Sequence, residues 1–226
     1  EIYTLSLHDA LPISLSDAGS TLQYKRINNS SHWTAYLNNT ISGAGTVSLM
    51  GKGDINQSSY YIQKSSPNFS GLFVVQADAR AGIYNGAAFG TGTVEVKDKG
   101  GVYIELNSGS LANNFKLAGE GWLENAGRLG AMRLIKGQFT GDILLTADAR
   151  IGAWIGQDGT ISGVISDDGK GYGFEKWGTG RIYLTGASTY GGKTYVADRR
   201  ILHLNYLYYD LIYLKLCQLH HLLSLM

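Results

Sequence analysis

One block of the sequence occurs twice, seventy residues apart. Residues 69–80 read FSGLFVVQADAR and residues 139–150 read FTGDILLTADAR, and Gly82 and Gly152 follow at the same offset. Each copy is a short apolar run that ends in an identical Ala-Asp-Ala-Arg. We take the charged residues of that tetrapeptide as markers of the repeat: Asp78, Arg80, Asp148 and Arg150. The duplication predicts a solenoid, because every coil of a solenoid presents the same corner to the coil above it.

A second motif is Gly-x-Gly followed by a strand-like alternation of side chains. It occurs at residues 43–49 (GAGTVSL), 90–96 (GTGTVEV) and 178–184 (GTGRIYL). Alternation with period two predicts strands with one apolar face, and the glycines suit tight corners. Helical periodicity is almost absent, so the pattern predicts an all-β fold. At roughly 20 to 25 residues a coil, the seventy-residue offset is about three coils, and residues 20–197 make about eight.

Glycine also divides the chain into segments. All 31 glycines lie between Gly19 and Gly192. We therefore assign residues 19–198 to the solenoid, residues 1–18 to a leader and residues 199–226 to a tail. The chain does not open with a secretory signal, and we expect any such signal to lie outside this fragment.

Both flanks have features of non-native sequence. Residues 1–13, EIYTLSLHDALPI, resemble the translation of a sequencing adapter, with a native amphipathic leader as the alternative, and we leave them out of the fold prediction. Polar residues interrupt the leucine-rich run at 201–226, so it predicts no membrane span. We interpret this tail as a frameshifted end, with a genuine amphipathic helix as the alternative. We assign no metal to its paired histidines, His220 and His221.

Charge and cysteine content argue against several classes of partner. The chain has 19 basic and 18 acidic residues, so no excess charge favours nucleic acid or an anionic membrane. Its single cysteine, Cys217, cannot form an intramolecular disulfide or a cysteine metal cluster. We expect no cofactor, no nucleic acid partner and no insertion of this segment into a membrane.

The sequence offers little catalytic chemistry. Between the flanks the sole histidine is His32, and a lone histidine in a polar segment does not predict a triad. Asp167 and Asp168 precede Gly-Lys-Gly-Tyr-Gly and predict a turn, with a calcium or sugar site as the alternative. Asp148 and Asp158 belong to the same group of carboxylates. We therefore name no catalytic, cofactor-binding or metal-binding residue.

Aromatic side chains gather in the second half of the chain. They are Trp122, Trp154, Tyr172, Phe174 and Trp177. Packing in the core or at the corners is the interpretation we favour, and an exposed platform for sugar stacking is the alternative.

Residues 147–196 resemble a known repeat. The run is Gly-Thr-Gly, an alternating strand, and then Thr-Gly-Ala-Ser-Thr-Tyr-Gly-Gly-Lys-Thr-Tyr-Val. It resembles the autotransporter-associated β-strand repeat of passenger domains in type V secretion, with Ser188 in place of the usual asparagine. The positions that match the family pattern are Gly178, Gly180, Leu184, Gly186, Thr189, Tyr190, Gly191, Gly192, Thr194 and Val196. Upstream of about residue 119 the resemblance is looser.

The resemblance implies a right-handed parallel β-helix exported across the outer membrane of a Gram-negative bacterium. The implied partner is a C-terminal translocator β-barrel of the same precursor, which this fragment does not include. The implied role is a display stalk at the cell surface that serves adhesion, with a host-surface or carbohydrate ligand. The alternatives are a β-helical polysaccharide lyase or glycosidase, and a filamentous adhesin exported by a separate partner protein.

Overall fold

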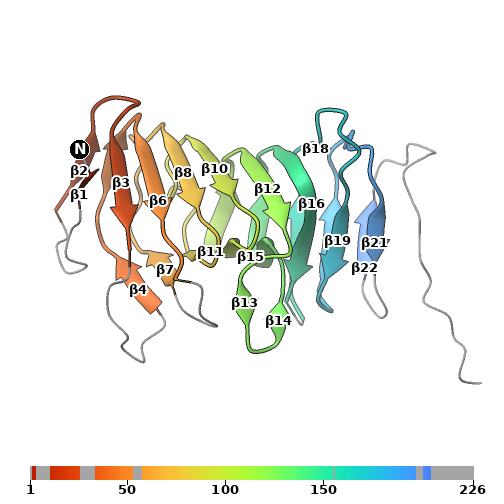
Figure 1. Ribbon diagram of the computed structural model, residues 1–226. Coiled ribbons are helices and arrows are strands. Elements are labelled where there is room, and N and C mark those ends of the chain that lie inside the picture. The colour runs from red at the N-terminus through yellow and green to blue at the C-terminus, as the bar shows by residue number, and fades with distance from the viewer. Residues whose placement is uncertain are drawn as a thin grey trace, which may run out of the picture.

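The computed structural model describes residues 2–3, 11–25, 34–52, 58–154, 156–196 and 201–204. Within these ranges the chain forms strands and turns without a helix, and successive coils stack along one axis (Figure 1). All strand pairs are parallel except one hairpin. The predicted parallel β-helix is therefore confirmed.

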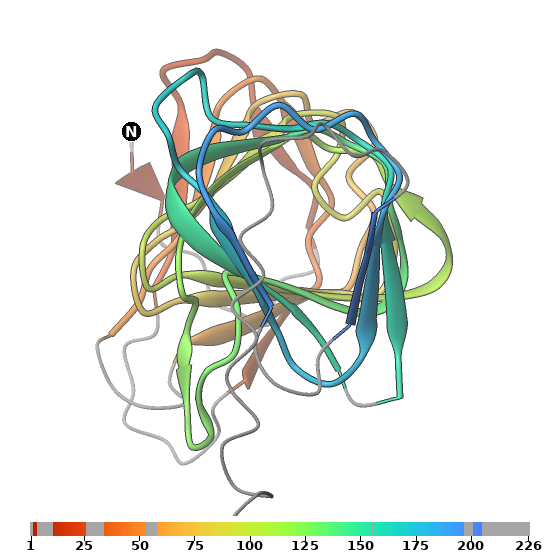
Figure 2. The same cartoon turned by 90° about the vertical axis from the view of Figure 1, so that its right-hand side faces the viewer.

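Three strips of parallel strands form the sides of the solenoid, as the view along its axis shows (Figure 2). Face 1 consists of β1 (Ile2–Tyr3), β3 (Thr21–Tyr24), β6 (Thr46–Leu49), β8 (Leu72–Val75), β10 (Thr93–Val96), β12 (Phe115–Gly119), the first part of β16 (Ile143–Ala153) and β18 (Ile165–Ser166). Face 2 consists of β4 (Thr34–Leu37), β7 (Ser59–Ile62), β9 (Arg80–Ile83), the first parts of β11 (Gly101–Leu111) and β15 (Met132–Phe139), the second part of β16, β19 (Phe174–Trp177) and β21 (Thr194–Val196).

Face 3 consists of β2 (Ile13–Leu15), β5 (Ile41–Gly43), the last residues of β11 and β15, β17 (Asp158–Ile161), β20 (Arg181–Leu184) and β22 (Ile201–Leu204). The strands β2 and β22 thus stack as rungs although they lie in the leader and tail segments. Strand pairing requires only backbone groups and apolar side chains, so it does not test whether these two segments are native sequence. The non-native origin of both segments therefore stays a prediction.

The inward side chains of face 1 form a continuous apolar row. Its seven rungs are Leu22, Val47, Phe73, Val94, Phe115, Ile143 and Ile165, all buried. Successive rungs lie from 21 residues (Phe73 to Val94) to 28 residues (Phe115 to Ile143) apart, close to the 20 to 25 expected, and one further coil follows Ile165. The coil from Phe115 to Ile143 includes the antiparallel hairpin of β13 (Leu123–Glu124) and β14 (Gly127–Arg128). This hairpin projects from the solenoid in both views (Figures 1 and 2).

A column of glycines follows the corner that leads from face 3 into face 1. A Cβ atom at Gly71 would overlap the carbonyl oxygen of Gly45, and one at Gly163 would overlap the carbonyl oxygen of Gly141. Side chains are excluded there because each corner lies directly on the backbone of the previous one. The column is Gly45, Gly71, Gly92, Asn113, Gly141, Gly163 and Gly186, with Asn113 donating to the carbonyl oxygen of Gly92 at 2.8 Å.

The two copies of the duplicated block lie in register, three rungs apart. Arg80 pairs with Gly101, the next residue Val102 pairs with Met132, and Met132 pairs with Ile151, which follows Arg150. On face 1, Phe73 is likewise three rungs from Ile143, at the same seventy-residue offset. The repeat therefore reflects coil stacking, as the sequence predicted.

Candidate functional site

The outer surface of face 2 presents a column of bulky side chains. The register aligns Tyr36, Tyr61, Gly82, Tyr103, Arg133, Gly152 and Trp177 on successive rungs. The two glycines are the pair that follow the duplicated blocks. A Cβ at Gly82 would collide with the ring of Tyr61, and one at Gly152 would overlap the carbonyl oxygen of Leu129 and crowd Cγ of Arg133. Gly82 thus makes room for the tyrosine of a neighbouring rung, and Gly152 allows a close approach of the backbone.

Tyrosines form the first part of this surface. The rings of Tyr36 and Tyr61 have centroids 6.0 Å apart, and those of Tyr61 and Tyr84 are stacked at 5.2 Å. Burial raises the pKa of Tyr84 to about 12, and the neighbouring Tyr61 phenol adds to the shift. The Tyr84 phenol is therefore uncharged at neutral pH and contributes hydrogen-bonding and ring surface.

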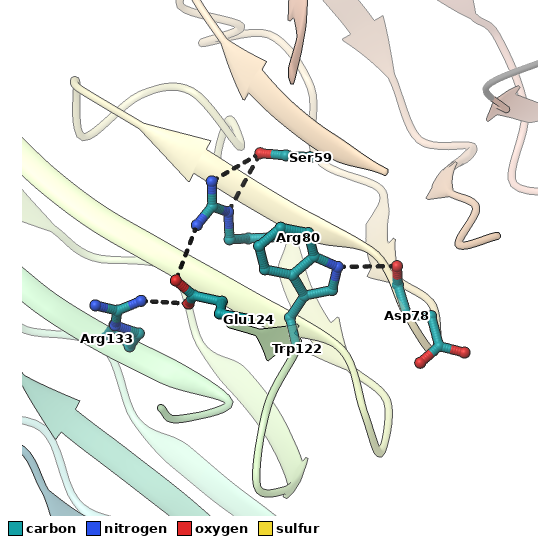
Figure 3. Close-up of polar contacts among 6 residues, drawn as sticks. All are labelled: Ser59, Asp78, Arg80, Trp122, Glu124 and Arg133. Atoms are coloured by element: carbon teal, nitrogen blue, oxygen red, sulfur yellow. Dashed lines mark hydrogen bonds and ion pairs between the residues drawn. The ribbon is translucent and has the colours of Figure 1, made fainter. Parts of the chain in front are cut away.

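The hairpin β13–β14 is held on this surface by arginines. The Glu124 carboxylate pairs with Arg133 and lies 3.8 Å from a nitrogen of Arg80 (Figure 3). The Arg80 guanidinium also donates to Oγ of Ser59 at 3.0 Å and 3.2 Å and lies 4.4 Å from the ring centroid of Trp122. Charge-assisted hydrogen bonds and cation–π contacts of this kind fix the orientation of the guanidinium.

The indole of Trp122 anchors the start of the hairpin. It is buried, and its Nε1 donates to the backbone carbonyl of Asp78 at 3.1 Å (Figure 3). Asp78 itself lies in a turn with a positive φ of 59°, whereas Asp148 lies within the continuous strand β16. The Asp148 carboxylate accepts the backbone N–H of Gly173 at 2.8 Å. The identical tetrapeptides therefore have the same register and different local conformations.

Arg150 holds the other side of the hairpin. Its guanidinium pairs with Glu175 at 2.8 Å and with Glu120 at 3.3 Å, and it donates to the backbone carbonyl of Arg128 at 2.6 Å. It also lies 4.3 Å from the ring centroid of Trp177. Sequence reasoning marked Arg80 and Arg150 as repeat residues, but it did not foresee Glu120, Glu124 or Arg133. These partners lie on or beside the inserted hairpin and in β15, the strand that follows it. The spacing of the repeat does not reveal their positions.

A pocket of about 540 Å³ opens beside Arg150. Its walls are the base of the hairpin, the second part of β16 and the corner loops around residues 171–173 and 191–193. The side chains that line it include Glu120, Asp148, Arg150, Glu175, Lys193 and Tyr195. Carboxylates, cations and two aromatic residues, Phe174 and Tyr195, thus line a single concave space.

Residues 178–196, in which the sequence motif resembles a known repeat, form most of one coil. Leu184, Tyr190 and Thr194 are buried, and the hydroxyls of Tyr190 and Thr194 are 2.5 Å apart. Tyr190 packs edge-on against Phe174, with centroids 5.5 Å apart. The backbone N–H of Thr189 donates to the carbonyl of Ile165 at 2.8 Å. These contacts dock the coil on the rung before it.

The glycines of that coil occupy corners. Gly186 ends the glycine column, while Gly191 and Gly192 line the pocket. The carbonyls of Gly178 and Gly180 accept hydrogen bonds from Nζ of the fully buried Lys176, whose strand β19 pairs with Val196. The motif Gly-x-Gly therefore occurs at two corners: residues 43–45 and 90–92 precede face 1, and residues 178–180 precede face 3.

Asp167 and Asp168 lie at a turn. This is the first of the two interpretations of these residues, the other being a calcium or sugar site. The buried Asp167 side chain accepts backbone N–H groups of its own loop, among them those of Gly169, Gly171 and Tyr172. Burial alone would raise the pKa of Asp167, but these hydrogen bonds outweigh it and the pKa lies below its ordinary value. Among the described residues no group of three His, Cys, Asp or Glu is placed to hold a metal ion. His32, Cys217, His220 and His221 lie outside those residues.

The aromatic residues of the second half divide between core and surface. Phe174 and Trp122 are buried, which fits the packing interpretation, while Trp154 is 43 % exposed on face 2. Tyr36 and Tyr195 are the other exposed aromatics of that face, at 55 % and 44 %. Exposed aromatic surface among the described residues is thus concentrated on face 2.

Comparison with known proteins adds no relative. No family model, curated protein or solved structure matches the chain. The described residues include no helix long and apolar enough to cross a membrane.

Proposed function

We propose that residues 19–198 are part of the stalk of an autotransporter passenger, displayed outside a Gram-negative cell and used in adhesion. The observation that supports this role is the stacking of the coils, in which every rung takes its backbone partners and its apolar contacts from the rung before it. The repeat-like sequence at 178–196 supports the passenger assignment. The partner for export is a translocator β-barrel of the same precursor.

The stacked coils suit export because each one is completed by its predecessor. An emerging coil buries apolar residues such as Phe115, which contacts Phe89 and Phe139 at centroid distances of 6.2 Å and 5.1 Å. Burial of apolar area stabilises by about 25 cal/mol per Å², and most of this is offset by the entropy of ordering the chain. A coil that has folded outside the cell resists backward movement, because its apolar row is already covered.

A display assay tests the proposal. The chain is fused between a secretion signal and a translocator barrel, and surface exposure is measured by protease treatment of intact cells. We expect the unaltered chain to be displayed and Phe115→Asp to be retained, because this change places a charge inside the solenoid. Lys116→Asp is the matched control, because Lys116 is the exposed neighbour in the same strand β12. Failure of the unaltered chain to reach the surface, or equal display of both variants, contradicts the proposal.

A further inference from the structure

The pocket beside Arg150 has the dimensions and chemistry of a small-molecule site. Its volume of about 540 Å³ lies within the range of ligand pockets, which runs from about 300 to 1,000 Å³. It opens on face 2, the face on which the exposed aromatic residues gather. The glycines at its rim, Gly171, Gly173, Gly191 and Gly192, place no side chains in the space.

The charges in the pocket argue against an anionic ligand. The lining includes three carboxylates, those of Glu120, Asp148 and Glu175, and two cations, Arg150 and Lys193. The Arg150 guanidinium is already engaged by both glutamates and by a backbone carbonyl. A phosphate, sulfate or uronate would therefore meet a net negative lining whose arginine is occupied.

The same groups suit a neutral ligand with many hydroxyls. Carboxylate oxygens accept hydrogen bonds from hydroxyl groups, and a lysine ammonium donates to them. Glu120 lines the pocket, and its side chain is 61 % exposed although one of its oxygens pairs with Arg150. A divalent cation is a poorer fit, because the described residues place no three metal-ligating side chains together.

Tyr195 supplies the apolar contact that such a ligand requires. Tyr195 lies in strand β21 and pairs in register with Glu175 of β19. It lines the pocket, and 44 % of the residue is exposed. An aromatic ring packs against the C–H face of a pyranose while polar groups bind the hydroxyls at its edge. We propose that this pocket binds one neutral sugar residue of a glycan. The proposal deepens the adhesive role and rests on it for its biological setting.

Saturation-transfer NMR and titration with the full chain test the inference. The probes are methyl β-D-galactopyranoside, methyl α-D-mannopyranoside and methyl N-acetyl-β-D-glucosaminide, with D-galacturonate as the anionic comparison. We expect at least one neutral glycoside to bind with a Kd of about 1–10 mM, and galacturonate to bind more weakly. Absence of binding by all three neutral probes, or stronger binding of galacturonate, overturns the proposal.

Variants locate the binding. Tyr195→Ala should weaken it about tenfold, and Glu120→Gln, which retains the side-chain shape, should weaken it several-fold. Tyr36→Ala is the matched control, because Tyr36 is an exposed tyrosine of the same face at its opposite end. Circular dichroism verifies that each variant folds. If Tyr195→Ala does not fold, Glu120→Gln alone tests the site. A loss of binding in Tyr36→Ala equal to that in the pocket variants rules out the site.

The display assay separates this inference from the proposed function. Tyr195→Ala should reach the cell surface as efficiently as the unaltered chain, because its side chain lies outside the stacked core. Display without sugar binding overturns the pocket assignment alone. Sugar binding without display overturns the passenger role alone.

Discussion

Arg80 and Arg150 occupy the same outward position on face 2, three rungs apart, and hold opposite sides of one hairpin. Arg80 reaches Glu124 in β13, while Arg150 reaches Glu120 and the carbonyl of Arg128 at the end of β14. The duplication therefore supplies one cation from a coil that precedes the inserted hairpin and one from a coil that follows it. An insertion in a solenoid coil would otherwise extend from the surface without contacts to orient it.

Loss of Arg80 should loosen the hairpin. In Arg80→Ala, Trp122 loses its cation–π contact and Glu124 retains Arg133 as its partner. We expect the free energy of unfolding to fall by about 2 kcal/mol, measured by urea denaturation with tryptophan fluorescence. Arg181→Ala is the control, because the pair of Arg181 with Asp158 spans 3.9 Å between two half-exposed side chains. A similar loss in both variants would show that the contacts of Arg80 with the hairpin add no more stability than an exposed ion pair.

A methyl group in the glycine column should be poorly tolerated. In Gly163→Ala the new Cβ overlaps the carbonyl oxygen of Gly141, so adjacent coils must separate locally. We expect a destabilisation of about 3 kcal/mol in thermal or urea unfolding. Gly191→Ala is the control, because a Cβ there meets its nearest atom at 3.6 Å, an ordinary contact distance. An unchanged stability in Gly163→Ala would mean that the corners do not lie on one another.

The regular features of the fold were predictable because they repeat. The offset between the copies of Ala-Asp-Ala-Arg gave the three-rung spacing, and the Gly-x-Gly runs marked corners. The alternation in residues 174–177 also contained a signal that was missed: Phe174 and Lys176 lie on the same side of the strand, so a buried lysine was implied. Its partners, the carbonyls of Gly178 and Gly180, belong to the next motif.

The candidate site was not predictable from the repeat, because it arises where the repeat is broken. Glu120 and Glu124 belong to an insertion, and their distance from Arg150 and Arg80 depends on how the hairpin folds back. Tyr195 reaches the pocket through its register with Glu175, which follows from the loop lengths between coils. Neither the fold of the hairpin nor the register of Tyr195 can be derived from the periodicity of the sequence.

The phenylalanines of the core should contribute more to stability than exposed aromatics of similar size. Phe115 is fully buried and contacts Phe89 and Phe139 edge-on. Phe115→Ala should lower the free energy of unfolding by about 3–5 kcal/mol, because a cavity remains in the centre of the solenoid. Tyr36→Ala, at an exposed site on face 2, should cost less than about 1 kcal/mol in the same urea titration. Equal losses would contradict the burial pattern.

Asp167 should make the stability depend on acid pH. Its pKa is lowered in the folded protein, since backbone N–H groups that stabilise the carboxylate outweigh the cost of burial. The unfolded state therefore binds its proton first as the pH falls below the ordinary value of 3.8. The contribution of Asp167 is complete above that value and is lost as the pH falls through the lowered pKa. Unfolding free energies measured from pH 6 to about pH 2 should show this loss.

Asp167→Asn isolates the contribution of this carboxylate. The variant cannot ionise, so it should be less stable than the unaltered chain at pH 6, and the two should converge at the acid end. Asp17 also has a lowered pKa, caused by the Ser20 side chain and the Gly19 N–H, but it is present in both proteins and cancels in the difference. A constant difference across the whole pH range would show that Asp167 stabilises its loop through the shape of the side chain and not through its charge.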